Sequence, residues 1–298
     1  LQKKLRLSTT VPLSIFTEYD PKNNLPANIG IFSSNVSGSG TSTQKPAYRF
    51  LCCGKGGGSS NKTFFMQGTK ANLNEQSFKE FLTEKIRNLG TSACPPYTIA
   101  VVVGGLSPEQ NLLALKLATC GGFDSEKKMS LLKNTFSLQD NILRDNKWEH
   151  IVLDIAKNTK LGAQFGGSQL AINAVVLRLP RHGASCPISI GVSCSAHRNL
   201  EMFINEDGIF IEKTISDPKT LDNFENAICF ADSSIECPII QTDFGIQSCC
   251  NVLSKLNCGQ RIKISGTILV ARDAAHAKWK ELVDSGKSLN KKKKKYPI

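Results

Sequence analysis

The strongest constraint on the fold is an uninterrupted apolar run, "YTIAVVV", over residues 97–103. It is rich in β-branched residues and has no alternating polar positions, which indicates a strand buried on both faces. Two glycines follow, and then "SPEQNLLALKLATC" begins with Ser107 as a helix cap, Pro108 at the first helical position and Gln110 to complete a capping box. The sequence therefore predicts a central strand followed directly by a helix.

Helical and strand patterns alternate along the rest of the chain. Helices are predicted at "NEQSFKEFLTEKIRNLG", with Asn74 as cap and Gly90 as stop, and at "KWEHIVLDIAKNTKLG" and "SCCNVLSKLNCG". Strands are predicted at "AYRFLCC" and "NAVVLRLP", and a hairpin at "EMFINEDGIFIEK". Residues 213–242 are interpreted as a connector, and "RIKISGTILVARDAAHAKWKELVDSGK" as strand, turn and helix without a partner strand. The predicted fold class is α+β (mixed α/β), not a regular doubly wound sheet.

The charge and the apolar patterning exclude two classes of function. The net charge is +12, but five of the lysines form one run over residues 291–295, which is typical of a solvated segment. Few aromatic residues accompany the basic ones, so we do not expect a nucleic-acid partner. No apolar run is long enough to span a bilayer, so we expect no membrane partner.

Eleven cysteines is a high and odd count, without the regular spacing of a disulfide scaffold. We therefore predict a reducing compartment in which most cysteines are small buried apolar residues. Cys94, before two prolines, is placed on a rigid loop beside the buried strand, and Cys194 on a loop after a strand. Neither belongs to a CxxC pair, which makes zinc a poor fit, although separate loop cysteines can converge on one iron–sulfur cluster.

Two further stretches have alternative interpretations. "GKGGGSSNK" follows a predicted strand, and its glycines suit either close approach of an anionic ligand or a tight turn. "RHGASCPISIGVSCSAHRN", residues 181–199, is interpreted as a polar loop that could face a cleft. Its His182 is, taken alone, more typical of a structural histidine than of a catalytic one.

Several long motifs in order carry a family resemblance. They are "KGGGSSNKT", "LGTSACPPY", "GGLSPEQNLLALKLA", "LGAQFGG", "LRLPRHGASCPISIGVSCSAHRN", "GIFIEK" and "GTILVARDAAHAKWKELVDSGK". Together they resemble the iron–sulfur (class I) fumarate hydratases, with the L-tartrate dehydratases as the related alternative. The resemblance covers nearly the whole chain.

The resemblance implies a hydro-lyase that interconverts (S)-malate and fumarate plus water. Its cofactor is a 4Fe-4S cluster held by three cysteines, whose open iron acts as a Lewis acid on the substrate. The implied partners are a dicarboxylate substrate and a second copy of the chain in a homodimer, in the cytoplasm or the mitochondrial matrix. The implied architecture is a large N-terminal iron–sulfur hydro-lyase domain over 1–246 and the beginning of a swivelling C-terminal β/α domain over 247–298.

The resemblance also assigns roles to individual residues. Cys94 and Cys194 match two cluster ligands, whereas Cys186 matches none and is expected to be structural. Four residues match positions that contact substrate: Arg6, Gly58, His182 and Arg272, of which His182 is the candidate catalytic residue and a neighbour of Cys194.

Two departures from the family pattern accompany these matches. The third cluster cysteine belongs to a Cys-Gln-Asp-Thr-Gly segment upstream of this chain, and the family's catalytic threonine lies downstream of it, so we expect a chain truncated at both ends and inactive alone. His197 stands where the family usually has aspartate. A non-catalytic iron–sulfur or scaffold relic is therefore a further alternative.

Overall fold

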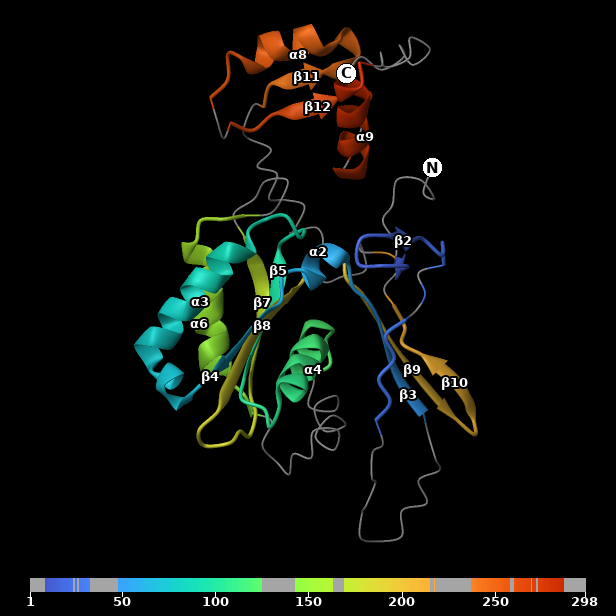
Figure 1. Ribbon diagram of the computed structural model, residues 1–298. Helices are drawn as coiled ribbons and strands as arrows, with labels where there is room; N and C mark the ends of the chain where they lie inside the picture. Colours follow the sequence, from blue (N-terminus) through green and yellow to red (C-terminus); the bar gives the residue numbers. More distant parts are fainter. Residues whose placement is uncertain are drawn as a thin grey trace. The chain divides into compact units, whose positions relative to one another are not determined.

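The computed structural model describes residues 9–23, 25, 27–32, 48–124, 143–162, 169–214, 217, 237–257, 260–268, 270–271 and 273–286. The chain divides into two compact units (Figure 1). One consists of Ile31–Thr214, and the other combines Leu1–Gly30 with Ile215–Ile298. Arg6, Arg272 and the lysine run over 291–295 lie outside the described residues.

The larger unit is built on a five-stranded sheet with the order β4-β8-β5-β7-β6 (Figure 1). The predicted buried strand is confirmed as β5, at the centre of this sheet. It runs parallel to β7 and antiparallel to β8, and the outer strands β4 and β6 are antiparallel to their neighbours. The strands are β4 (Phe64–Gly68), β5 (Tyr97–Val103), β6 (Leu143–Arg144), β7 (Ala171–Arg178) and β8 (Cys186–Ser193). The mixed strand directions agree with the predicted α+β class.

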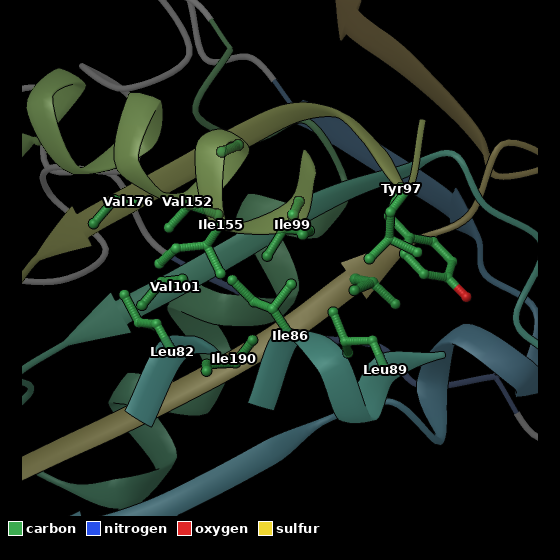
Figure 2. Packing of buried hydrophobic residues seen from close by; sticks show 14 of the residues in the cluster. Leu82, Ile86, Leu89, Tyr97, Ile99, Val101, Val152, Ile155, Val176 and Ile190 are labelled. Atoms are coloured by element: carbon green, nitrogen blue, oxygen red, sulfur yellow. The ribbon is translucent and has the colours of Figure 1, made fainter. Parts of the chain in front are cut away.

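Helices cover both faces of this sheet. Because successive strand residues point to opposite faces, Ile99 and Val101 pack against α3 (Glu75–Leu89) and α6 (Asn146–Asn158), as Figure 2 shows. Ala100 and Val102 belong instead to the apolar cluster around α4 (Pro108–Thr119). β5 is thus buried on both sides, which explains why its sequence is continuously apolar.

The predicted helix caps are confirmed. Asn74 Oδ1 accepts hydrogen bonds from the backbone N–H groups of Gln76 and Ser77, and α3 ends at Gly90, whose φ is 59°. Ser107 Oγ accepts from the N–H of Gln110 at the start of α4. The Gln110 side chain accepts from the N–H of Leu106, one residue before the cap, so the predicted reciprocal bond reaches one residue further back.

A second sheet of the same unit has the order β10-β9-β3. Its strands are β3 (Tyr48–Gly54), β9 (Arg198–Asn205) and β10 (Gly208–Ile211), and all pairs are antiparallel. The predicted hairpin is therefore confirmed, with Glu206 and Asp207 as its turn. The short helix α2 (Gly57–Ser60), the strand β4 and the 3₁₀ turn η1 (Lys70–Leu73) follow β3 along the chain.

The interpretation of residues 181–199 as a loop is wrong over its middle, because Cys186–Ser193 forms β8, a strand buried along its whole length. Pro187 and Gly191 made the sequence pattern unlike that of a strand, because both residue types are depleted in central strands. Both have a local reason here. The Pro187 carbonyl accepts from the N–H of Gly104, and a Cβ on Gly191 would lie 3.1 Å from Leu115.

Among its described residues, the smaller unit contains two separate strand pairs. β1 (Val11–Pro12) and β2 (Glu18–Tyr19) are antiparallel, whereas β11 (Ile239–Gln241) and β12 (Lys263–Ser265) are parallel. The 3₁₀ turn η3 (Thr242–Phe244) and the helix α8 (Ile246–Leu253) connect β11 to β12, and α9 (Asp273–Asp284) follows. The expectation that the strand after Arg261 has no partner is wrong, because β11 lies in the segment interpreted as a connector. No helix among the described residues is long and apolar enough to cross a membrane.

Candidate functional site

Cys94 lies on a short, tightly held loop before β5. Its φ is 61°, a backbone conformation that side-chain-bearing residues rarely adopt. The phenol of Tyr97 holds the loop in place, because its oxygen accepts a hydrogen bond from the N–H of Ala93 (3.2 Å) and its hydroxyl donates one to Gly90 O (2.9 Å). Burial raises the pKa of Tyr97, so this phenol stays a hydrogen-bond donor.

Cys194 follows the last residue of β8 and lies beside Cys94. Ser195 donates twice to the carbonyl oxygen of Cys94, from its N–H at 3.1 Å and from its Oγ at 3.2 Å. The two predicted cluster cysteines, a hundred residues apart in sequence, are therefore on loops that are bonded to each other. Cys194 is buried, with 7% of its surface exposed.

His197, the departure from the family pattern, contacts the backbone of Cys194. Its N–H donates to Cys194 O at 3.1 Å, and its Nδ1 lies 2.7 Å from the same oxygen, where it must carry the proton to donate. The histidine therefore stabilises the Cys194 loop, and the substitution for aspartate is accommodated there.

The glycine-rich segment packs against the Cys94 loop. It forms α2, and Ser59 Oγ donates to Gly56 O. A Cβ on Gly58 would lie 3.5 Å from Cα of Ala93, so Gly58 borders the residue before Cys94. The segment is one helical turn beside the cysteine loops and not a simple tight turn, and its approach to an anionic ligand stays a prediction.

Lys55, which sequence reasoning missed, places a positive charge beside this site. Burial lowers its pKa, the charge on Lys116 acts in the same direction, and the sulfur groups of Cys120 and Cys194 oppose the shift. Its ammonium donates to Thr119 Oγ1 at 2.9 Å. It also borders a pocket of about 230 Å³ whose other lining residues are Ser60, Thr63, Leu112, Leu115, Lys116 and Thr119. A lysine directly before a glycine run was the signal that could have indicated it.

The structure does not bring His182 to Cys194 within this chain. The cysteines lie where β5 begins, since Thr98 pairs with Ser193, whereas His182 follows β7, whose end at Arg178 pairs with Val103. A strand rises about 3.3 Å per residue, which puts roughly 20 Å between these ends of the seven-residue β5. His182 is exposed, and its Nδ1 accepts from the N–H of Ala184.

The donor set fits an iron–sulfur cluster in part. Cysteine thiolates are the usual ligands of such clusters, and two cysteines converge here. Within the described ranges, no group of three or more His, Cys, Asp or Glu side chains is arranged to hold a metal ion. Cys186 is fully buried in β8, in agreement with its expected structural role.

Comparisons with known proteins agree with the motifs. The model of the family described as Fumarate hydratase (Fumerase) matches residues 1–202, and that of the Fumarase C-terminus matches residues 219–298. "Fumarate hydratase 2" of Leishmania major is 41% identical over 294 residues, which are 99% of this chain and 49% of that protein. "Fumarate hydratase class I, anaerobic" of Escherichia coli K12 is 41% identical over 298 residues, which are 100% of this chain and 51% of that protein.

A more distant match is the "Putative L(+)-tartrate dehydratase subunit alpha" of Methanocaldococcus jannaschii, 26% identical over 178 residues, which are 59% of this chain and 57% of that protein. The chain thus spans about half the length of the fumarate hydratases that it matches.

Proposed function

Since this chain belongs to the class I fumarate hydratase family, we propose that it forms part of a hydro-lyase that interconverts (S)-malate and fumarate plus water. The observation that carries the proposal is the double hydrogen bond from Ser195 to Cys94 O, which joins the two cysteine loops. The division into domains at residue 246 and the compartment stay predictions, and the relatives include a fumarate hydratase from L. major with "mitochondrial" in its name.

Cys94 and Cys194 are proposed as two of the three ligands of a 4Fe-4S cluster, with the third cysteine outside this chain. When bound, the cluster would supply a Lewis acid for the hydroxyl that leaves malate. The chain's own contribution is to hold both thiolates on rigid loops: Tyr97 supports one loop, and His197 supports the other.

The surroundings of the two cysteines suit an anionic substrate. Lys55 adds positive charge beside Cys194, which favours a nearby substrate carboxylate. Gly58 presents backbone without a side chain next to the Cys94 loop, in agreement with its proposed contact with substrate. Arg6 and Arg272 are proposed to bind the substrate carboxylates because bidentate arginine–carboxylate pairs give orientation as well as affinity.

The proposed substrate role of His182 needs a second copy of the chain. Within one chain roughly 20 Å of strand separates it from the cysteines. The proposed homodimer would reconcile the two, because a partner can bring its own histidine to the cysteine loops. Mixed dimers test this: one chain carrying His182→Asn and another carrying Cys194→Ala should regain activity at one of their two sites, whereas either variant alone should not.

The cluster proposal is tested by replacing each thiol in the full-length protein, prepared without oxygen. Cys94→Ala and Cys194→Ala should each lose cluster-bound iron and sulfide, and fumarate hydration should fall below detection. The hydrogen bonds that join and support the two loops are accepted by the backbone carbonyl oxygens of these cysteines, so they remain possible in both variants.

Cys52→Ala is the matched control, because Cys52 is exposed on β3. It should keep its iron and its activity. Retention of the full iron content by Cys94→Ala would contradict the assignment. The alternative substrate is tested in parallel. Turnover of L-tartrate in preference to fumarate would favour the tartrate dehydratase alternative, which is supported by the 26% identity to a putative tartrate dehydratase subunit. A protein with iron and neither activity would be the non-catalytic relic.

A further inference from the structure

Cys53 and Cys120 form a thiol pair apart from the proposed cluster ligands. Cys53 lies in β3, and Cys120 is the residue at which α4 ends. The Cys53 side chain hydrogen-bonds to that of Cys120, so the two sulfur atoms are neighbours. Cys53 is exposed and Cys120 is 4% exposed, so the pair has one sulfur near solvent and one beneath it.

Independent contacts hold the two segments together. Asn199, which pairs with Cys53 across β3 and β9, donates from Nδ2 to Cys120 O at 2.8 Å. Two residues beyond Cys53, Lys55 donates from Nζ to Thr119 Oγ1 at 2.9 Å. Hydrogen bonds on both sides of the two cysteines thus hold their segments next to each other.

The two thiols differ in acidity. The hydrogen bond from Cys53 lowers the pKa of Cys120 to about 6, against the effect of burial and helped by the charge on Lys55, the Thr119 hydroxyl and Lys116. The same hydrogen bond, with burial and the Cys120 charge, raises the pKa of Cys53. At neutral pH the pair therefore holds one proton between two sulfur atoms, as in dithiols that exchange with disulfides.

We propose that Cys53 and Cys120 are a redox dithiol that a small disulfide, such as oxidised glutathione, converts into a disulfide bond within the chain. As the exposed Cys53 sulfur attacks one sulfur of the external disulfide, its proton passes to the Cys120 thiolate, and one external thiolate is released. Cys120 then gives this proton to the released thiolate, and the Cys120 thiolate attacks Cys53 of the mixed disulfide and displaces the second external thiolate, which takes a proton from water. This forms the Cys53–Cys120 bond. Two electrons pass from the chain to the external disulfide, which becomes two molecules of thiol.

The test uses the full-length protein under argon, so that oxygen does not attack a bound cluster. The protein is incubated with oxidised glutathione, remaining thiols are alkylated, and peptides are mapped by mass spectrometry without reduction. The expected product is a peptide pair joined through Cys53 and Cys120, lighter by two hydrogens and separated again by dithiothreitol. Cys53→Ser and Cys120→Ser should both lose this pair.

Cys52→Ser provides the matched control, because Cys52 is also exposed but is the neighbour of Cys53 on the opposite face of β3. This variant should form the linked pair at the wild-type level. The proposal is overturned if wild-type Cys53 accumulates as a stable mixed disulfide with glutathione while Cys120 remains alkylated, or if Cys120 links to a different cysteine. If a serine variant does not fold, the wild-type map decides alone.

Discussion

The two ends of β5 are built in different ways. At the end that contains Cys94 and Cys194, two loops meet through hydrogen bonds to the Cys94 carbonyl oxygen, and the Cys194 carbonyl oxygen accepts hydrogen bonds within its own loop. At the end after Val103, two backbone segments approach closely. The φ of Gly104 is 96°, and a Cβ on this residue would lie 2.1 Å from Leu179 O. There Asn111 Nδ2 lies within hydrogen-bonding distance of three carbonyl oxygens, those of Val102, Gly104 and Pro187.

The two ends of β5 therefore differ in role: one contributes mainly to stability, and the other carries the candidate functional site. The end after Val103 is held by the close approach of two backbone segments and by the buried Asn111 side chain. The cysteine end is held by hydrogen bonds to backbone carbonyl oxygens, so the cysteine side chains remain available to bind a ligand. Substitutions at the end after Val103 should therefore change mainly the free energy of unfolding, and those at the cysteine end should also change iron binding.

The largest effect on stability is expected for Gly104→Ala. A Cβ there would lie 2.1 Å from Leu179 O, and the positive φ adds strain. We expect a loss of about 3 kcal/mol or more in the free energy of unfolding. Urea denaturation measures it, with Gly183→Ala as control, since no atom lies within 4 Å of the added Cβ there. The control should change stability by less than about 0.5 kcal/mol. Equal stability of the two variants would contradict the close approach.

A smaller loss is expected for Asn111→Ala, because it leaves buried carbonyl oxygens with one donor fewer. We expect a loss of about 2 kcal/mol in the free energy of unfolding, and iron binding should be unchanged because Asn111 lies at the other end of β5. Asn88→Ala, on an exposed position of α3, is the matched control. Loss of iron from Asn111→Ala would show that the two ends are coupled.

Tyr97→Phe tests the cysteine end. It removes the hydroxyl that donates to Gly90 O and accepts from the N–H of Ala93, and we expect the free energy of unfolding to fall by about 1 kcal/mol. Because Ala93 precedes Cys94, iron should also leave the variant faster when a chelator is added. Tyr48→Phe, on exposed β3, should release iron at the wild-type rate. Equal release from both variants would mean that the phenol supports only the fold.

The last prediction concerns the pH dependence of the Cys53–Cys120 pair. The folded pKa of Cys120, about 6, is below its usual value of 9.0, so its contribution to stability grows as pH rises from about 6 to 9 and is lost as pH falls through 6. The raised pKa of Cys53 acts in the opposite sense, and its contribution is lost above about pH 9. The stability difference between wild type and Cys120→Ser, measured anaerobically, should therefore be largest near pH 9. A difference that does not vary between pH 6 and 9 would contradict the shared proton.

The sequence by itself determined the longer helices, the central strand and the family. The caps at Asn74 and Ser107 act within three residues, and the apolar run of β5 reports its own burial, so local patterns were sufficient there. The matching motifs likewise singled out Cys94 and Cys194 as candidate cluster ligands before any geometry was known.

Only the tertiary structure decided which residues meet. β8 was missed because its proline and glycine are compatible with a strand only in contact with Gly104 and Leu115, which lie far away in sequence. The same holds for the bond between the Cys94 and Cys194 loops, the pairing of Cys53 with Cys120, and the separation of His182 from Cys194. Strand order and register are set by packing between distant segments, and a sequence pattern reports only the few residues around it.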